Sequence, residues 1–222
     1  MRRGECTQED IQRLRSTSGT VVDRDGIVAT RLCTHVKEAA QINEQELARL
    51  GGDAPRVFRA TDDPADDPQA SKILGAACPA AGVLRLTEGA QVMITKNLDV
   101  ATGLVNGTRG IVLGFTSTGS PRIRLVCGRD IVVRHETWTV RGCGRYMSRR
   151  QLPLQLAWAV SIHKSQGMTL DAVEVSLANC FESGQAYVAI SRARSLEGMR
   201  VRGFSASAVK AHPLVKAFYA KI

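Results

Sequence analysis

The order of strand and helix signals along the chain restricts its fold more than any other feature of the sequence. From about Gln91 to Arg150, short β-prone runs are separated by Gly and Asn, and Asn106-Gly107 marks one of the turns. On both sides of this stretch, β-prone runs alternate with runs of helical period. This order predicts an α/β sheet domain into which a small closed β-barrel is inserted.

The part before the β-rich stretch begins the α/β domain. The run at 27–32, Ile-Val-Ala-Thr-Arg-Leu, predicts a buried strand. A helix is expected over 35–50, with Thr34 as its N-cap and Gly51-Gly52 after its end. Asn43 falls on the apolar face of this helix, where a polar side chain needs a partner. That partner is either a neighbouring backbone group or a ligand.

The other elements follow from the same patterns. Residues 61–68 are acidic and contain two prolines, which predicts a loop. Strands are expected over 83–86, 91–95, 172–177 and 200–202. After Pro153 the apolar residues recur with helical period, which predicts a helix that ends at Gly167. Ser183 is expected to cap a helix over 183–194, and residues 213–220 should form a final amphipathic helix.

Charge and cysteine content narrow the class of protein. Thirty Lys and Arg against 21 Asp and Glu give a formal net charge of +9, which favours a polyanionic partner. No apolar run approaches the roughly 18 residues that a membrane span needs, and residues 1–5 lack the apolar stretch of a signal peptide. We therefore expect a soluble, non-secreted protein with no membrane partner. The six cysteines include no Cys-x-x-Cys pair, which indicates thiols in a reducing compartment and predicts no metal site.

The β-rich stretch is also the most basic part of the chain. Its arginines form either a solubilising surface or a groove that binds a nucleic-acid backbone, and the sequence favours neither reading. The residues concerned are Arg109, Arg122, Arg124, Arg129, Arg134, Arg141, Arg145, Arg149 and Arg150.

Two segments carry the chemistry. Residues 161–167, Ser-Ile-His-Lys-Ser-Gln-Gly, form a polar cluster typical of a contact with nucleic acid. Residues 184–194, Gly-Gln-Ala-Tyr-Val-Ala-Ile-Ser-Arg-Ala-Arg, place Arg192 on a predicted helix, where its guanidinium is suited to sensing a phosphate. The chain contains neither a Gly-x-x-x-x-Gly-Lys-Ser/Thr loop nor an Asp-Glu dipeptide. The sequence therefore indicates half of a nucleotide-driven motor.

With these segments, the chain resembles the petite-integration-frequency DNA helicases, relatives of RecD in helicase superfamily one. The resemblance runs from about residue 25 onward and is to the C-terminal half of an animal member. Besides the two segments above, it rests on residues 29–35 (Ala-Thr-Arg-Leu-Cys-Thr-His), 89–93 (Gly-Ala-Gln-Val-Met), 103–107 (Gly-Leu-Val-Asn-Gly) and 152–159 (Leu-Pro-Leu-Gln-Leu-Ala-Trp-Ala).

The resemblance implies a fold and a division of the chain. The family's motor has two RecA-like domains with ATP between them. This chain would provide the second, a P-loop NTPase-type sheet without its own P-loop, with an SH3-like β-barrel inserted. The implied parts are a remnant or linker from the preceding RecA-like domain (1–25), the two parts of the second domain (26–90 and 151–206), the insertion (91–150) and a C-terminal helix (207–222).

The resemblance also implies roles for individual residues. Arg192 matches the arginine finger that reaches the γ-phosphate of ATP, and Gln166 and Gly167 lie near the nucleotide. The structural alternatives are a surface ion pair for Arg192, an N-cap role for Thr34 and a core position for His163. The residues that match the family's contacts with single-stranded DNA are Thr34, His35, Ser161, His163 and Lys164.

The implied activity is that of an ATP-dependent, five-prime-to-three-prime DNA helicase. It would use ATP and Mg²⁺, with the Mg²⁺ ligands in the missing first RecA-like domain, so this chain alone is expected to be inactive. Expected partners are single-stranded DNA, fork or quadruplex-like DNA, and the missing N-terminal RecA-like domain.

The resemblance further implies roles in DNA repair, DNA recombination and telomere maintenance, in the nucleus, the mitochondrion or both. Met168-Thr169 stands where many relatives carry a glutamate that contacts the ribose, so ribose recognition by this half is not implied. The alternative function is that of a truncated, non-catalytic isoform that binds nucleic acid or interferes with the complete helicase.

Overall fold

The computed structural model of the chain describes residues 1–19, 26–177 and 180–221. The chain divides into two compact units, one formed by residues 1–44 and 158–222 and the other by residues 45–157. The second unit is wider than the 91–150 stretch predicted as an insertion. Among the described residues, no helix combines the length and the apolar character that crossing a lipid bilayer requires.

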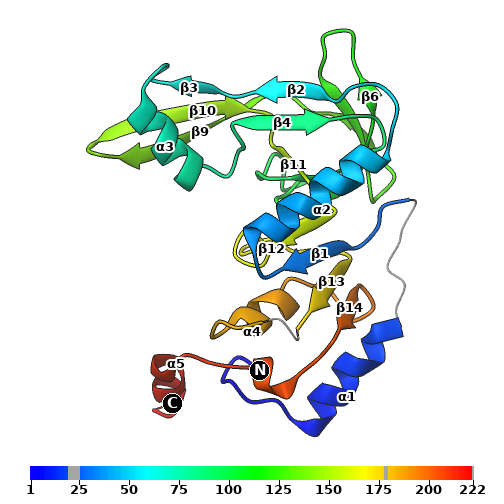
Figure 1. Ribbon diagram of the computed structural model, residues 1–222, viewed down its shortest axis with the longest axis vertical. Helices are drawn as coiled ribbons and strands as arrows, with labels where there is room; N and C mark the ends of the chain where they lie inside the picture. Colours follow the sequence, from blue (N-terminus) through cyan, green and yellow to red (C-terminus); the bar gives the residue numbers. More distant parts are fainter. Residues whose placement is uncertain (20–25, 178–179, 222) are drawn as a thin grey trace. The chain divides into compact units, whose positions relative to one another are not determined.

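A four-stranded parallel sheet belongs to the first unit (Figure 1). Its order is β12 (Ala159–Ser161), β1 (Thr30–Cys33), β13 (Val173–Ser176) and β14 (Met199–Arg202). The strands predicted at 27–32, 172–177 and 200–202 are confirmed as β1, β13 and β14. Leu32, Val173 and Val175 are buried in the core. Because all four strands run in the same direction, their carboxyl ends meet at one edge of the sheet.

Helix α2 (Val36–Arg49) packs on this sheet and begins one residue after its predicted start. Its residues Ala39 and Ile42 pack in an apolar cluster with Cys33 and Ala159. Asn43 donates from Nδ2 to the carbonyl of Ala159 at 2.8 Å and accepts from its N–H at 2.9 Å. The side chain of Asn43 thus completes the free edge of β12, and its partner is a backbone group, the first of the two predicted alternatives.

Helices α1 (Gln8–Ser16), α4 (Gln185–Ile190) and α5 (Pro213–Tyr219) also belong to the first unit. Helix α1 begins with a capping box, in which the side chains of Thr7 and Asp10 each accept a bond from the other's N–H. Helix α4 is shorter than the helix predicted over 183–194. Its N-cap is Gly184, with a left-handed φ of 81°, so the prediction that Ser183 caps it is wrong. Short 3-10 turns, η1 (Thr17–Gly19) and η2 (Ala206–Ala208), complete the unit's regular elements as described.

Five antiparallel strands form the largest sheet of the second unit. Their order is β11 (Leu154–Leu156), β5 (Gln91–Ile94), β6 (Arg109–Phe115), β7 (Pro121–Leu125) and β8 (Asp130–Val132). Gly110 of β6 lies so close to β7 that an added Cβ would meet the Arg124 carbonyl oxygen at 2.6 Å. The pairings leave β11 and β8 at the two edges of this sheet. Its closure into a barrel therefore stays a prediction.

Two further sets of strands extend the second unit beyond residues 91–150. Strand β2 (Arg56–Arg59) pairs with β4 (Val83–Leu86), and β10 (Arg145–Gln151) pairs with both β3 (Thr61–Asp63) and β9 (Glu136–Gly142). Helix α3 (Pro68–Ala77) is capped by Asp67, whose carboxylate accepts bonds from the N–H groups of Gln69 and Ala70. Leu74 of α3 packs with Met147 of β10. Neither β2 nor α3 was predicted from the sequence.

Two local predictions are wrong. The residues after Pro153 form β11 and β12 rather than a helix, because the first segment pairs with β5 and the second with β1. A short apolar run is compatible with a helix or a strand, and here non-local hydrogen bonds decide. Residues 61–68 are not a loop throughout, because Thr61–Asp63 pairs with β10 and α3 begins at Pro68.

Candidate functional site

The carboxyl ends of β1 and β12 bring together residues that are far apart in the sequence. The last residues of the two strands are register partners. Thr34 and His35 directly follow β1, Ser161 ends β12, and His163 and Lys164 come just after it. Thr34 and Ser161 are buried, whereas His35, His163 and Lys164 are exposed. All five residues that the resemblance assigns to DNA contact therefore lie at one edge of the sheet.

Residues 162–167 form a tight turn held by its own hydrogen bonds. The N–H of Ser165 donates to the carbonyl of Ser161 at 3.0 Å, and its hydroxyl donates to the carbonyl of Ile162 at 2.7 Å. The N–H of Lys164 donates to Oγ of Ser161 at 3.4 Å. Gly167 has a φ of 78°, which glycine adopts without strain. These bonds fix the backbone of the turn, while the side chains at positions 163, 164 and 166 stay exposed.

Arg192 follows α4 and is bonded to the same turn. Its Nη1 donates to the carbonyl of Met168 at 3.0 Å and to that of Ser165 at 3.4 Å. These two residues flank Gln166 and Gly167, so the predicted nucleotide-binding set lies together. Within the described residues, the hydrogen bonds of the Arg192 guanidinium all go to uncharged oxygens. Its positive charge is therefore not neutralised by any of these bonds and suits an anionic ligand.

Two residues at this edge were missed by the sequence predictions. The ring of Phe181 stacks on that of His35, with centroids 5.2 Å apart and an interplanar angle of 25°. The Oε2 atom of Glu182 lies 3.0 Å from Nε2 of His163. Both residues follow β13, the neighbour of β1 in the sheet. The sequence did predict β13, and residues that follow a parallel strand lie at the same edge of the sheet as those that follow its neighbours. That position was the signal by which both residues could have been found.

The buried thiols at this edge are poorly suited to chemistry. Burial raises the pKa of Cys33 to about 12, the charge of Glu38 acts in the same direction and that of Arg31 opposes it. Burial also raises the pKa of Cys180. A thiol that stays protonated is a poor nucleophile and a poor metal ligand. In the part of the chain that the structure describes, no group of three or more His, Cys, Asp or Glu could hold a metal ion.

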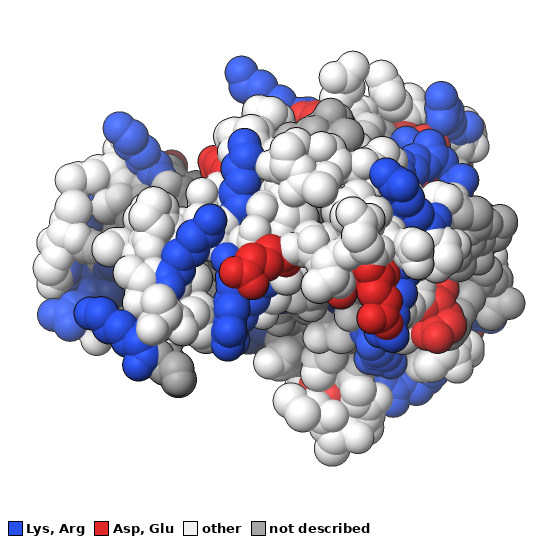
Figure 2. Space-filling model, turned by 90° about the horizontal axis from the view of Figure 1, so that it is seen from below, with Lys and Arg blue, Asp and Glu red and all other residues white. Residues whose placement is uncertain are grey.

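Several arginines of the β-rich stretch are engaged within the protein. Arg149 donates to both carboxylate oxygens of Asp62, at 2.7 and 2.8 Å, and its side chain is only 6% exposed. Arg124 makes the same kind of pair with Asp130, at 2.8 and 3.1 Å, and Arg109 is buried. On the face in Figure 2, acidic side chains lie among the Lys and Arg side chains. A groove for a nucleic-acid backbone would thus need other arginines.

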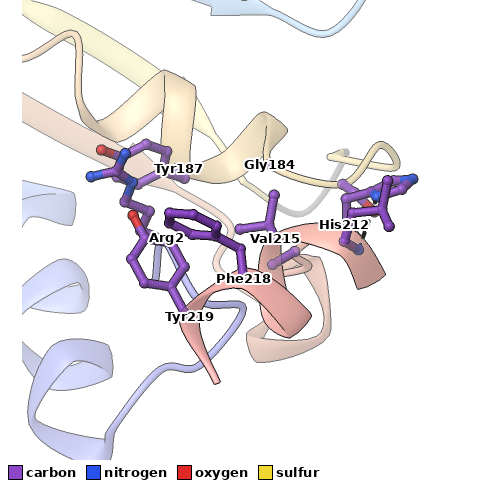
Figure 3. Close-up of a pocket in the computed structure, with 10 residues that line it drawn as sticks. Arg2, Gly184, Tyr187, His212, Val215, Phe218 and Tyr219 are labelled. Atoms are coloured by element: carbon purple, nitrogen blue, oxygen red, sulfur yellow. Dashed lines mark hydrogen bonds between the residues drawn. The ribbon is translucent and has the colours of Figure 1, made fainter. Parts of the chain in front are cut away.

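A cavity of about 410 Å³ lies elsewhere in the first unit (Figure 3). Tyr187 of α4 and Phe218 and Tyr219 of α5 contribute aromatic rings to it, and the guanidinium of Arg2 lies 5.5 Å from the ring centroid of Tyr219. None of the residues that the resemblance assigns to DNA or nucleotide lines this cavity. Helix α4 thus contributes to the cavity, while Arg192 follows its other end.

Comparisons with known proteins give matches along the whole chain. The family model "DNA helicase Pif1, 2B domain" matches residues 71–115. The ATP-dependent DNA helicase PIF1 of Mus musculus is 54% identical over 225 residues, which cover 100% of this chain and 34% of the mouse protein. The chain therefore spans about a third of the length of this curated relative.

Two solved structures from Bacteroides match this fold. Pif1 in complex with ADP-AlF4 has a TM-score of 0.78 at 27% identity, covering 99% of this chain and 51% of the Bacteroides chain. Pif1 bound to ssDNA has a TM-score of 0.62 at 27% identity, covering 97% of this chain and 50% of the other. The α/β arrangement described above is thus shared with solved helicases.

Proposed function

The chain belongs to the Pif1 family of DNA helicases, and we propose that it is the part of an ATP-dependent, five-prime-to-three-prime DNA helicase that grips single-stranded DNA and presents Arg192 to ATP. ATP itself would be held by another RecA-like domain, because this sequence contains no phosphate-cradling loop. One observation carries the proposal. The turn at residues 162–167 lies at the ends of β1 and β12, where the residues assigned to DNA are found, and Arg192 bonds to the carbonyls of Ser165 and Met168 on either side of Gln166 and Gly167.

The proposed DNA grip consists of the strand ends of β1 and β12. Thr34 and Ser161 contribute hydroxyl groups, and the exposed side chains of His35, His163 and Lys164 add hydrogen-bond donors and a positive charge. Such groups bind phosphate oxygens and position a strand without reading its sequence. The Bacteroides relative solved with ssDNA supports this ligand class for the site.

Arg192 would act on the nucleotide. In phosphoryl transfer, negative charge on the phosphoryl oxygens is stabilised by a fixed guanidinium fork. In the structure the fork donates to the carbonyls of Ser165 and Met168. Turning it toward a phosphate would release bonds to the turn that carries His163 and Lys164. This provides a physical route by which the state of the nucleotide changes the grip on DNA, as translocation requires.

Strands β5 to β8 lie within residues 91–150 and support a further part of the proposal, an SH3-like insertion over those residues. The fifth strand of their sheet, β11, lies just outside this range. Arg149 and Arg109 are buried and serve the interior of this unit. Arg122, Arg134, Arg141 and Arg150 are exposed and remain as the candidates for contacts with a DNA backbone.

The experiment measures binding of the 222-residue chain to a single-stranded oligonucleotide by fluorescence anisotropy over a range of salt concentrations. Each phosphate contact contributes roughly 0.7 to the slope of log K against log salt for single strands. We expect Lys164→Ala to lower the slope by about that amount and His163→Ala to weaken binding. Lys216→Ala, an exposed lysine on α5, is the matched control and should change less. An equal effect of Lys164→Ala and Lys216→Ala would contradict the grip.

Turnover of ATP gives an independent test. The chain alone is expected to hydrolyse ATP only at background rate, even with saturating single-stranded DNA, because the groups that cradle phosphates and hold Mg²⁺ are not in this sequence. DNA-stimulated hydrolysis well above background by the chain alone would overturn the division of roles between two RecA-like domains.

A further inference from the structure

Phe181 is an exposed aromatic residue at a polar edge of the protein. Its side chain is 52% exposed although it is fully apolar. The ring lies against only one described aromatic partner, His35, at a centroid distance of 5.2 Å and an angle of 25°. A phenyl ring that is half exposed contributes little to the core, and the part of it that His35 does not cover is open to a ligand with an apolar face.

Hydrogen bonds restrain the His35 ring and the backbone of Phe181. Oγ1 of Thr34 lies 2.9 Å from Nδ1 of His35, which restrains the imidazole. The N–H of Phe181 donates to Oε1 of Gln185 at 3.0 Å, and Gln185 is buried in α4. With the imidazole and the Phe181 backbone restrained and the two rings stacked, the pair forms a surface that needs little ordering when a ligand binds.

The surface lies beside the phosphate contacts of the proposed function. His35 follows Thr34 at the end of β1, and the residue next to Phe181 in the chain, Glu182, contacts His163 at 3.0 Å. In a single strand, phosphates and bases alternate along the chain. A strand whose phosphates meet the ends of β1 and β12 thus has bases within reach of the ring pair.

We propose that Phe181, backed by His35, is a stacking platform for an unpaired base of the bound strand. This inference rests on the proposed function and adds a base contact to its phosphate contacts. Because every base has a π-face, the platform accepts any base and leaves binding independent of sequence. Loss of one stacking residue in other single-strand-binding proteins lowers affinity by roughly 5- to 150-fold.

The test compares two oligonucleotides of equal length, oligo-dT and a fully abasic strand with the same number of phosphates. We expect Phe181→Ala to weaken binding of the 222-residue chain to oligo-dT by about 5- to 150-fold and to leave binding to the abasic strand nearly unchanged. Phe181→Tyr should keep the affinity for oligo-dT. Phe181→Leu should behave as Phe181→Ala, because it retains an apolar side chain without a π-face.

Phe218→Ala is the matched control, since Phe218 is also an exposed phenylalanine, at 59%, but lies on α5. It should bind both strands as the unchanged protein does. If Phe181→Ala weakens binding equally to oligo-dT and to the abasic strand, or weakens neither, the platform is wrong. The phosphate grip still stands in that case if His163→Ala weakens binding. If the unchanged chain binds neither strand, the proposed function fails, and the platform fails with it.

Discussion

The Nε2 atom of His163 and the Oε2 atom of Glu182 lie 3.0 Å apart, so a carboxylate occupies a hydrogen-bonding site of the proposed DNA grip. A phosphate oxygen that binds His163 would have to displace this carboxylate and would be repelled by it. We therefore expect Glu182→Gln to raise the affinity for single-stranded DNA by up to about 5-fold, because interactions between exposed charges are worth roughly 0.2–1 kcal/mol. Fluorescence anisotropy at low salt measures the change.

The control for this variant is Glu9→Gln. Glu9 is likewise an exposed glutamate with a side-chain partner, Arg13 at 2.6 Å, but it lies on α1. The same increase in both variants would show a general effect of net charge. A decrease for Glu182→Gln would mean that the carboxylate positions His163 for binding rather than competing with the strand.

Arg192 should govern ATP turnover rather than DNA affinity. In a complete helicase that carries this chain, we expect Arg192→Ala to lower the steady-state rate of ATP hydrolysis by roughly 10³–10⁵-fold, as in related phosphoryl-transfer enzymes. Affinity for single-stranded DNA should fall less than it does in His163→Ala, because Arg192 bonds to the carbonyls of Ser165 and Met168, whereas His163 is an exposed side chain of the proposed grip itself.

Arg192→Lys sharpens this test because it keeps the charge and loses the planar fork, so a large part of the rate should still be lost. Arg194→Ala is the comparison on the same segment, since Arg194 is exposed. If Arg192→Ala hydrolyses ATP at the normal rate and Arg194→Ala hydrolyses it slowly, Arg194 and not Arg192 is the arginine finger.

The sequence predicted most of the parallel sheet and much less of the second unit. β1, β13 and β14 are short runs with apolar residues at most of their buried positions, and they were predicted correctly. The stretch from Leu154 to Ser165 has helical period, yet it forms β11 and β12, because its backbone bonds to β5 and β1 outweigh local preference. Strand β3 was not predicted for a similar reason, because it is formed by pairing with β10, which lies far along the chain.

The candidate site was predicted in part. Thr34, His163 and Arg192 were assigned by resemblance, and the structure brings their segments together, although their roles stay predictions. Phe181 and Glu182 had no motif of their own, because their importance depends on the ring of His35 and the imidazole of His163 across the sheet. Periodicity describes one segment at a time and cannot reveal a contact of this kind.

Arg149 should prove to be a stabilising residue and not a DNA contact. Its guanidinium makes a bidentate pair with Asp62 in which the two side chains are 6% and 16% exposed, and this pairing raises the pKa of Arg149. Removing one partner of a buried pair leaves the other charge uncompensated, which costs about 3–5 kcal/mol. We expect Arg149→Ala to lower the free energy of unfolding by about that amount in urea titrations.

The control is Arg124→Ala, which breaks a bidentate pair with Asp130 whose side chains are 51% and 39% exposed. Exposed pairs contribute only about 0.2–1 kcal/mol, so this variant should stay near the unchanged stability. If Arg149→Ala is as stable as Arg124→Ala and instead lowers the salt slope of DNA binding, Arg149 faces the nucleic acid.

We expect the side chain of Asn43 to contribute more to the free energy of unfolding than its half-buried position suggests. Its amide bonds both the N–H and the carbonyl of Ala159, a residue that is 1% exposed on the edge strand β12. Asn43→Ala leaves these two groups without partners, at about 1–3 kcal/mol for each in urea titrations. Gln41→Ala, at an exposed position of the same helix, should cost less than about 0.5 kcal/mol.

Asn43→Asp separates the two bonds. At neutral pH the carboxylate still accepts from the N–H of Ala159, but it faces the carbonyl oxygen without a donor, so the variant should be less stable than the unchanged chain. Protonation would restore a donor and is therefore favoured in the folded state, which raises the pKa of the introduced carboxyl there. The deficit relative to the unchanged chain should shrink as the pH falls toward about 4, near the ordinary pKa of an aspartate. A deficit that does not depend on pH would show that the bond to the Ala159 carbonyl contributes nothing.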